Sequence, residues 1–356
     1  MWTRALVGSV LLAACADEAA PDADVVAVTE LGAMANPAGI EGRDGGVSGR
    51  FGDRSVWVYG DGVATIAGTY PNTWRNNTMS WTADLDAADG IDGFVQPTDS
   101  EGAAREFFPR TSQEQEFNDA HVDRGDGSCA DPCGARYAIW GAGPIADPER
   151  DRYLLAYGKV YSEPGPWNFW IVGNSIAVWD DFDAGPARPE VDAALDDPTL
   201  LFDAEQDGEF AIPAVHAGDL YLFSCSGRGG GHGCRLARAP LADVLERDAY
   251  EFRTDDGWSS ASSDAVVLFD GSPNLTVHHS AHLDRWLAVY ADFGEIVLRT
   301  AEAPEGPWSG TGTIATPDGD AIHAHAHAEY QEAGGAVEYV SYLTDTFHLL
   351  RVELAP

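Results

Sequence analysis

Short runs of alternating apolar and polar residues make up most of the chain, and Gly, Asp, Asn and Pro separate them. Alternation with a period of two is typical of strands that bury one face. Helical periodicity is scarce: it predicts only a short helix over 110–120 and a helical turn over 241–248. The pattern therefore predicts an all-β protein.

Five segments of the chain share one arrangement. In each, a strand rich in aromatic residues is followed by a second alternating strand, and a further short strand precedes the pair. The aromatic strands begin at positions 55, 152, 219, 285 and 336, a loose period of roughly 50 to 100 residues. Such repeats are typical of β-propellers, whereas a β-sandwich does not need the same three-strand unit five times. We predict a five-bladed β-propeller that forms a single domain.

The composition restricts the classes of function. Hydrophobic residues make up 44% of the 356 residues, which is enough for a core. Acidic residues outnumber Lys and Arg by 58 to 21, so the formal net charge is −37. A chain with so little positive charge cannot neutralise a phosphate backbone, and nucleic acid is therefore excluded as a partner.

The N-terminus has the pattern of a bacterial lipoprotein signal. Residues 1–14 place one positive charge before a short apolar run, which ends in a Leu-Ala-Ala-Cys sequence at Cys15. This sequence resembles a lipobox and implies cleavage before Cys15 and lipidation of its thiol. An ordinary secretory signal is the alternative. We expect an acidic linker over 15–37, a propeller over 38–356, and a lipid anchor in the cell envelope, at the outer membrane or cell surface of a bacterium.

The other four cysteines form two close pairs in the sequence, Cys129 with Cys133 and Cys225 with Cys234. In an exported protein, local disulfides are the natural interpretation of such pairs. A zinc site is the alternative, but these spacings fit no common zinc module. We predict two disulfides, Cys129–Cys133 and Cys225–Cys234.

Several stretches resemble the domain of unknown function 4185 family. Ile40–Gly62 reads IEGRDGGVSGRFGDRSVWVYGDG and is similar to the start of the family's domain. Residues 136–161 resemble its second blade, and 272–290 followed by 299–309 resemble its fourth. The resemblance covers roughly residues 38–355.

The family resemblance implies a five-bladed propeller related to glycosidases that cut furanosides. Some members resemble endo-D-arabinofuranases, which hydrolyse the D-arabinan of mycobacterial cell walls. Their catalytic pair is two aspartates of the first blade, and the matching positions are Asp44 and Asp61. The family's threonine after the second aspartate is Gly62 here, and many relatives have no known activity.

Cleavage of a glycosidic bond requires two carboxyl groups. One protonates the leaving oxygen, and the other attacks the anomeric carbon or activates water. We expect Asp44 on the innermost strand of the first blade and Asp61 at the end of the next strand, where Gly60 and Gly62 leave room for a sugar. The alternative is that both are turn residues, because aspartate beside glycine is common in turns.

Further residues are candidates for binding the sugar. They are Arg43, Trp140, Glu209, Asn274 and His325. A tryptophan can stack on a sugar ring, and carboxylate and amide groups can bind its hydroxyl groups. A core position for the tryptophan and surface positions for the glutamate and asparagine are the alternatives. In an insertion, Glu114 or Glu116 can supply a third carboxylate at the rim.

Three histidines alternate near the C-terminus, so that His323, His325 and His327 share one face of a strand. Imidazoles on one face can bind a divalent metal. Side chains two positions apart on a strand are, however, roughly 7 Å apart, too far for three to share an ion without a bulge. We expect no cofactor and one histidine, His325, lining the channel. A central divalent metal near His325, as in some related glycosidase propellers, is the alternative.

We therefore predict an exported, monomeric glycoside hydrolase of a furanoside-containing polysaccharide, with Asp44 and Asp61 as acid/base and nucleophile or base. The main alternative is a surface lipoprotein that binds glycan without cutting it. A third is a structural propeller in which the two aspartates do not face each other.

Overall fold

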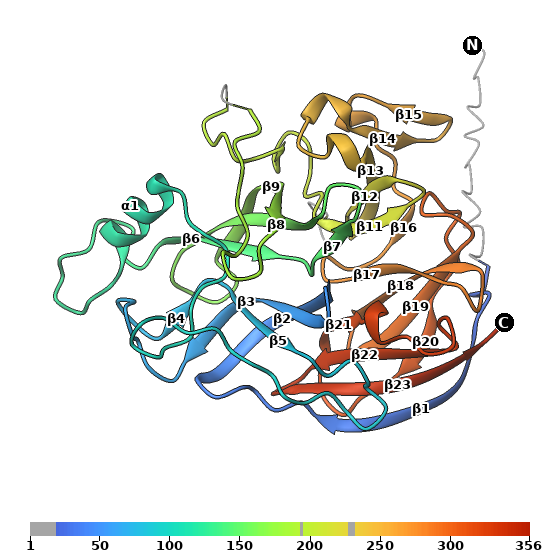
Figure 1. The fold of residues 1–356 in the computed structure, drawn as a ribbon. Coiled ribbons are helices and arrows are strands. Elements are labelled where there is room, and N and C mark those ends of the chain that lie inside the picture. Colours follow the sequence, from blue (N-terminus) through green and yellow to red (C-terminus); the bar gives the residue numbers. More distant parts are fainter. Residues whose placement is uncertain (1–18, 193–194, 227–231) are drawn as a thin grey trace, which may run out of the picture.

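The computed structural model describes residues 19–192, 195–226 and 232–356. Its strands form five antiparallel sheets around a common axis (Figure 1). The helical elements are α1 (Ser112–His121), η1 (Leu241–Asp243), η2 (Arg247–Ala249), η3 (Ser262–Asp264) and η4 (Ala328–Tyr330). The predicted five-bladed propeller is confirmed. The predicted signal peptide and Cys15 lie outside the described residues.

Each sheet is one blade. Blade 1 contains β2 (Ile40–Phe51), β3 (Arg54–Ala64), β4 (Trp74–Arg75) and β5 (Thr78–Thr82). Blade 2 contains β6 (Arg136–Gly141), β7 (Ile145–Asp147), β8 (Arg152–Ser162), β9 (Phe169–Trp179) and β10 (Phe202–Asp203). Blade 3 contains β11 (Ile212–His216), β12 (Asp219–Ser224), β13 (Gly233–Pro240), β14 (Glu251–Thr254), β15 (Gly257–Ser259) and β16 (Phe269–Asp270). Blade 4 contains β17 (Thr276–Ser280), β18 (Arg285–Asp292), β19 (Glu295–Ala301) and β20 (Gly312–Ala315). Blade 5 contains β21 (Ile322–Ala326), β22 (Val337–Leu343), β23 (Phe347–Ala355) and β1 (Asp24–Ala33).

The innermost strands form a ring around the axis. β2 contacts β7, β7 contacts β11, β11 contacts β17, β17 contacts β21, and β21 returns to β2. The strand ends and loops of five different blades therefore meet around one central space. Residues far apart in the sequence can act there together.

The core lies between neighbouring blades, and alternate residues of one strand serve different neighbours. On β3, Val56 and Val58 pack against blade 2, whereas Trp57 and Tyr59 pack against blade 5. Both faces of each sheet are thus buried, which explains the aromatic and branched residues in the repeated strands. No helix in the described part of the chain is long and apolar enough to cross a membrane.

The N-terminal strand completes blade 5. β1 pairs antiparallel with β23, and Figure 1 shows blue β1 beside red β23. The structure differs here from the expected linker over 15–37, because Asp24–Ala33 form the outermost strand of that blade. None of the β1 side chains is buried, so hydrophobic periodicity carried no signal for this strand. Its backbone hydrogen bonds cover the edge of β23 and join the two ends of the chain.

Both predicted disulfides are present. Cys129–Cys133 lies in the loop between α1 and β6, and Cys225–Cys234 joins the end of β12 to β13. Cys225 and Cys234 are buried in the core between blades 3 and 4. The zinc alternative is therefore excluded for these four cysteines.

Candidate active site

A cavity of about 1010 Å³ lies at the axis of the propeller, and all five blades contribute to its walls. It is lined by six residues singled out in the sequence: Asp44, Asp61, Trp140, Glu209, Asn274 and His325. These residues come from positions up to 281 apart in the chain, and the ring of inner strands brings them together. The third alternative, a propeller whose two aspartates are separated, does not describe this arrangement.

A β-bulge places Asp44 against Asp61. In the β2–β3 pair, the single residue Asp44 lies opposite two residues, Gly60 and Asp61. The backbone N–H of Asp61 donates a hydrogen bond to the Asp44 carboxylate. A Cβ at position 60 would lie 2.6 Å from Oδ1 of Asp44, so the glycine there leaves room for the Asp44 carboxyl group in this position. Both carboxyl groups therefore line the cavity from adjacent strands.

The surroundings of the two carboxyl groups set the order in which they ionise. Burial raises the pKa of Asp44 to about 7, and the negative charge of Asp61 adds to this shift. Burial also raises the pKa of Asp61, but Arg136 and the Trp140 N–H oppose that effect. Arg136 Nη2 lies 2.7 Å from Asp61 Oδ2, and Trp140 Nε1 lies 3.3 Å from Oδ1. Because the charge of Asp61 acts on Asp44, Asp61 ionises first and Asp44 holds its proton towards neutral pH.

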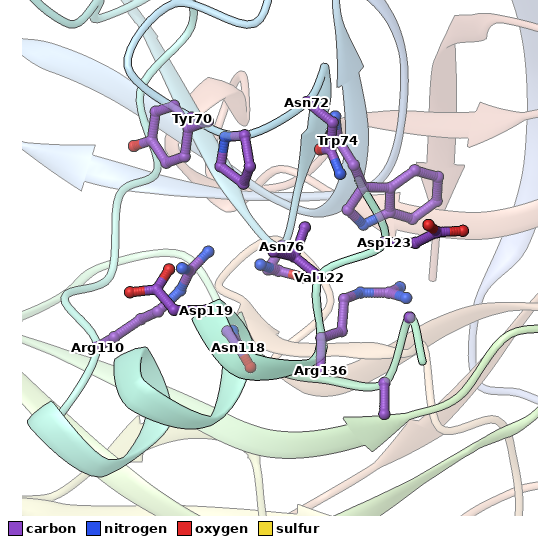
Figure 2. Close-up of a pocket in the computed structure, with 13 residues that line it drawn as sticks. Tyr70, Asn72, Trp74, Asn76, Arg110, Asn118, Asp119, Val122, Asp123 and Arg136 are labelled. Atoms are coloured by element: carbon purple, nitrogen blue, oxygen red, sulfur yellow. Dashed lines mark hydrogen bonds between the residues drawn. The ribbon is translucent and has the colours of Figure 1, made fainter. Parts of the chain in front are cut away.

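Arg136, which the sequence analysis missed, connects the central cavity with a smaller pocket of about 160 Å³ at the rim. Figure 2 shows Arg136 and Trp74 among the residues that line this pocket. The guanidinium carbon lies 4.8 Å from the centroid of a Trp74 ring, while Nη2 reaches Asp61. One feature of the sequence could have indicated Arg136 as a site residue: it is a basic residue at the start of β6, in a chain with only 21 basic residues.

Arg43 lies outside the cavity, contrary to the expectation that it binds substrate. Arg43 directly precedes Asp44 in β2, and successive side chains of a strand point to opposite faces. The Arg43 side chain therefore points to the other face of the strand from Asp44. Its guanidinium carbon lies 3.4 Å from the centroid of the Tyr59 ring, and Nη1 donates a hydrogen bond of 2.6 Å to Ser80 Oγ. Arg43 therefore connects β2 with β3 and β5 within blade 1.

Glu114 is likewise not a third carboxylate of the site. It closes a capping box with Thr111 at the start of α1. Its carboxylate pairs with Arg188 at 2.6 Å and with Lys159 at 3.1 Å. All of these groups are largely buried beside blade 2, so the pairs anchor the α1 insertion to the blade. Glu116 is exposed on the same helix.

His325 is a buried side chain that faces the cavity without good partners. Neither ring nitrogen makes a hydrogen bond of normal geometry, although the carbonyls of Gly45 and Gly46 lie close enough to favour a proton. Burial lowers the pKa of His325 to about 3, so the imidazole is neutral. A neutral imidazole can donate one hydrogen bond and accept another, which suits the hydroxyl groups of a sugar.

The three alternating histidines do not share one face. A register shift interrupts β21 between Ile322 and His325, and His323 has a φ of +49°. His323 also lines the cavity, with its ring 6.1 Å from that of His325. His327 does not line the cavity. Its ring centroid lies 4.1 Å from that of Trp57, and its Nε2 forms a hydrogen bond with Ser341 Oγ. His278 and His279 of β17 line the cavity as well, so four histidines line the channel where one was expected.

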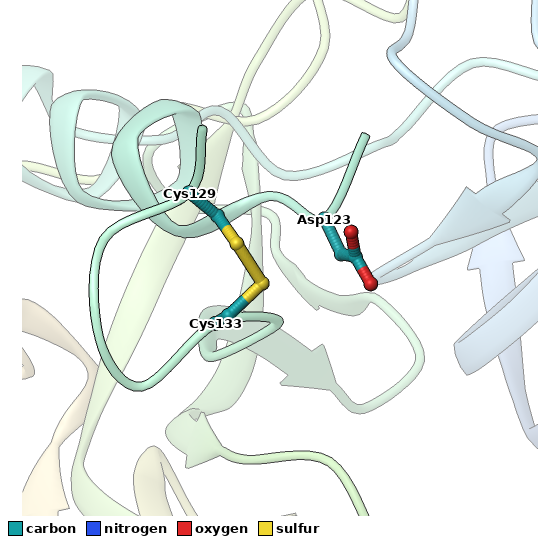
Figure 3. Close-up of side chains that lie close together, drawn as sticks. All are labelled: Asp123, Cys129 and Cys133. Carbon is teal, nitrogen blue, oxygen red and sulfur yellow. A yellow bond between two sulfur atoms is a disulfide. The ribbon is translucent and has the colours of Figure 1, made fainter. Parts of the chain in front are cut away.

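The described residues place no group of three close potential metal ligands around His325. In the described ranges, one group of three potential ligands has its atoms within 4.8 Å of one another, and it consists of Asp123, Cys129 and Cys133. Figure 3 shows that its two sulfur atoms are joined in a disulfide, so they are not thiolate ligands. This group also lies in the loop after α1, away from the axis.

Three exposed aromatic residues border the cavity: Trp167, Phe169 and Trp170. They lie in and after the turn between β8 and β9. The sequence shows aromatic residues here, but it does not distinguish exposed rings from the many buried ones.

The comparison with protein families gives one match. Residues 174–342 match the domain of unknown function DUF4185. This stretch runs from β9 of blade 2 to β22 of blade 5, and it does not include Asp44 and Asp61 of blade 1. Proteins of curated function gave no match to the sequence.

Several solved structures are similar to this chain. A protein of Bacteroides ovatus ATCC 8483 proposed to be a hydrolase has a TM-score of 0.57 at 13% identity, over 89% of this chain and 87% of that chain. The α-L-arabinofuranosidase PaAbf62A from Podospora anserina has a TM-score of 0.46 at 12% identity, over 95% and 98%. A GH62 α-L-arabinofuranosidase of Coprinopsis cinerea has a TM-score of 0.47 at 12% identity, over 93% and 98%. The chain is a five-bladed β-propeller whose residues 174–342 match the DUF4185 family, as its sequence indicated.

Proposed function

We propose that this protein is a glycoside hydrolase that cleaves a furanoside-containing polysaccharide with Asp44 and Asp61 as its catalytic pair. One observation carries the proposal: two carboxyl groups on adjacent strands line one cavity and ionise in succession. Such a pair is what glycosidic cleavage requires. The resemblance of Ile40–Gly62 to furanoside-cleaving relatives supports the substrate class.

The ionisation order assigns the two roles. Asp44 is the general acid, and it transfers its proton to the glycosidic oxygen as the bond from that oxygen to the anomeric carbon breaks. Asp61 carries the negative charge and attacks the anomeric carbon or takes a proton from the attacking water. Water supplies the new hydroxyl group in either case. Arg136 and Trp140 hold the Asp61 carboxylate in place through both of its oxygens.

Three further polar groups of the cavity bind the sugar. His325 offers a neutral imidazole, Glu209 a carboxylate before β11, and Asn274 an amide before β17. They come from blades 5, 3 and 4, and blade 5 is the neighbour of blade 1, which carries the catalytic pair. Their hydrogen bonds to hydroxyl groups would fix the orientation of the sugar relative to Asp44.

We also propose that the protein is exported and anchored in the cell envelope through Cys15. The two disulfides support this location, because such bonds persist in oxidising compartments. The proposal predicts that labelled palmitate is incorporated into the wild-type protein and not into Cys15→Ala. Equal labelling of the two proteins would contradict it.

The hydrolase proposal is tested by the release of reducing ends from arabinogalactan, lipoarabinomannan and plant arabinan. Asp44→Asn and Asp61→Asn should each reduce the rate by about 10² to 10⁴-fold, the usual contribution of such a group. Asp53→Asn is the matched control, since Asp53 is 95% exposed at the far end of the same β2–β3 hairpin. Saturable binding of the glycans without release would contradict hydrolysis and favour a glycan-binding protein.

A further inference from the structure

The turn between β8 and β9 and the first residues of β9 expose three aromatic side chains at the wall of the cavity. The exposed fractions are 85% for Trp167, 51% for Trp170 and 38% for Phe169. All three border the same cavity as Asp44 and Asp61. Large apolar side chains exposed together mark an interaction site, because water makes such a surface costly. We call these three residues the aromatic rim.

Trp167 is held in an unfavourable backbone conformation. Its φ is +60°, in the left-handed region that bulky residues rarely adopt. The ring is also the most exposed of the three, so contacts within the protein do not account for it. Strained residues of this kind cluster at ligand sites. Phe293 also combines a positive φ with full exposure, but of the two only Trp167 borders the cavity, so a ligand in the cavity can reach it.

The aromatic rim is continuous with the catalytic pair. The Phe169 ring lies 5.0 Å from that of Trp140 in an edge-to-face arrangement. Trp140 in turn donates its N–H to Asp61. Trp170 lies 4.7 Å from Tyr161, a residue of β8. An aromatic surface thus extends from Asp61 through Trp140 to Phe169, and Trp167 borders the same cavity.

The charge of this turn restricts the ligand. Residues 163–170 read EPGPWNFW and contain no basic side chain. Their one acid, Glu163, accepts a hydrogen bond from the Tyr161 hydroxyl. A phosphate, an anionic lipid surface or an acidic peptide would find no counter-charge here, in a chain of net charge −37. A neutral ligand with flat C–H surfaces fits, and sugar rings have such surfaces.

We propose that the aromatic rim is a second binding site for the polysaccharide, which holds sugar units beyond the bond that is cut. This inference rests on the proposed function and adds a property to it. A chain long enough to reach from Asp44 to Trp167 gains stacking contacts that a short oligosaccharide cannot make. The enzyme therefore prefers long chains to short oligosaccharides.

The test compares long and short substrates of the same linkage. In Trp167→Ala, KM for the polymer should rise about tenfold, the usual loss for an aromatic contact residue. The kcat/KM for the shortest cleaved oligosaccharide should stay within about twofold of the wild type, since that substrate does not reach Trp167. Trp167→Phe should recover most of the affinity for the polymer. Equal losses on both substrates, or none, would overturn the proposal.

Phe293→Ala is the matched control. Phe293 is fully exposed and also has a positive φ, but it lies in the β18–β19 turn and does not border the cavity. It should bind and cut like the wild type. Unchanged melting temperatures for these variants exclude loss of folding, which we do not expect for such exposed residues.

A second measurement separates failure of the rim from failure of the hydrolase proposal. Wild type, Trp167→Ala and Phe293→Ala are sedimented with insoluble arabinan, whether or not they release reducing ends. Loss of co-sedimentation in Trp167→Ala alone supports the rim even if no cleavage occurs. Equal co-sedimentation of all three overturns it. Binding to neutral phosphatidylcholine vesicles that requires Trp167 would also overturn it, since the ligand would then be a membrane.

Discussion

Replacing Asp44 by asparagine should stabilise the protein at alkaline pH while it removes activity. Burial raises the pKa of Asp44 to about 7 from an ordinary value of 3.8. When the pKa of a carboxyl group is higher in the native state than in the unfolded state, its contribution to stability is fully present at pH values below the unfolded-state pKa. That contribution is lost as the pH rises through the native pKa, because the native state then has to hold a buried charge. For Asp44 the loss occurs between about pH 4 and pH 7.

The size of the effect follows from the difference between the two pKa values. The pKa of Asp44 differs by about three units between the two states, and each unit corresponds to about 1.4 kcal/mol. Above pH 7, Asp44 therefore lowers the free energy of unfolding by about 4 kcal/mol. At pH 5 the cost is only about 2 kcal/mol, since native Asp44 keeps its proton there. Asparagine is uncharged at both pH values, and its Oδ1 can accept the same hydrogen bond from the Asp61 N–H. The variant should therefore gain about 2 to 3 kcal/mol more over the wild type at pH 8 than at pH 5.

Urea unfolding at pH 5 and pH 8 measures this difference. Asp53→Asn serves as the control, because its carboxyl group is exposed and should give the same small change at both pH values. The reasoning is refuted if Asp44→Asn changes stability equally at pH 5 and pH 8, or if the variant is less stable than the wild type at pH 8. Either result would mean that the Asp44 carboxylate is well solvated and is not tuned to carry a proton.

Three further predictions concern other parts of the molecule. Arg136→Gln removes the salt bridge to Asp61, so the pKa of Asp61 should rise further and the acid limb of the pH–rate profile should move to higher pH by about one unit or more. The double variant Cys225→Ala/Cys234→Ala should lose about 3 kcal/mol of unfolding free energy in urea, because the bond between these buried cysteines restricts the unfolded chain. Deletion of β1 should lower the melting temperature and promote aggregation, seen by light scattering, because the edge of β23 becomes unpaired.

The architecture could be predicted because the blades are buried on both faces. The aromatic strands repeat five times, and every repeat has to fill the space between two neighbours, as β3 does with Val56 and Trp57 on opposite faces. β1 could not be predicted in the same way. Its side chains stay exposed or half-buried, and its place is fixed by backbone hydrogen bonds that leave no trace in the pattern of apolar residues.

The site could be predicted only in part. The resemblance of the first blade pointed to Asp44 and Asp61, and both line the cavity. The same motif suggested Arg43, but alternation along the strand directs that side chain away from the cavity. Arg136 binds Asp61 across 75 positions of sequence, a contact that only the ring of blades creates. Contacts of this kind depend on how the blades are placed, and a short motif does not contain that information.

The most direct test of the account is the rate of reducing-end release from lipoarabinomannan by wild type and Asp44→Asn, measured side by side on folded protein. The account predicts release by the wild type and a loss of about 10² to 10⁴-fold in the variant. Equal rates for the two proteins would contradict the assignment of Asp44 as the general acid. If the wild type bound this glycan and the other arabinans without cleaving any of them, the propeller would be a glycan-binding protein.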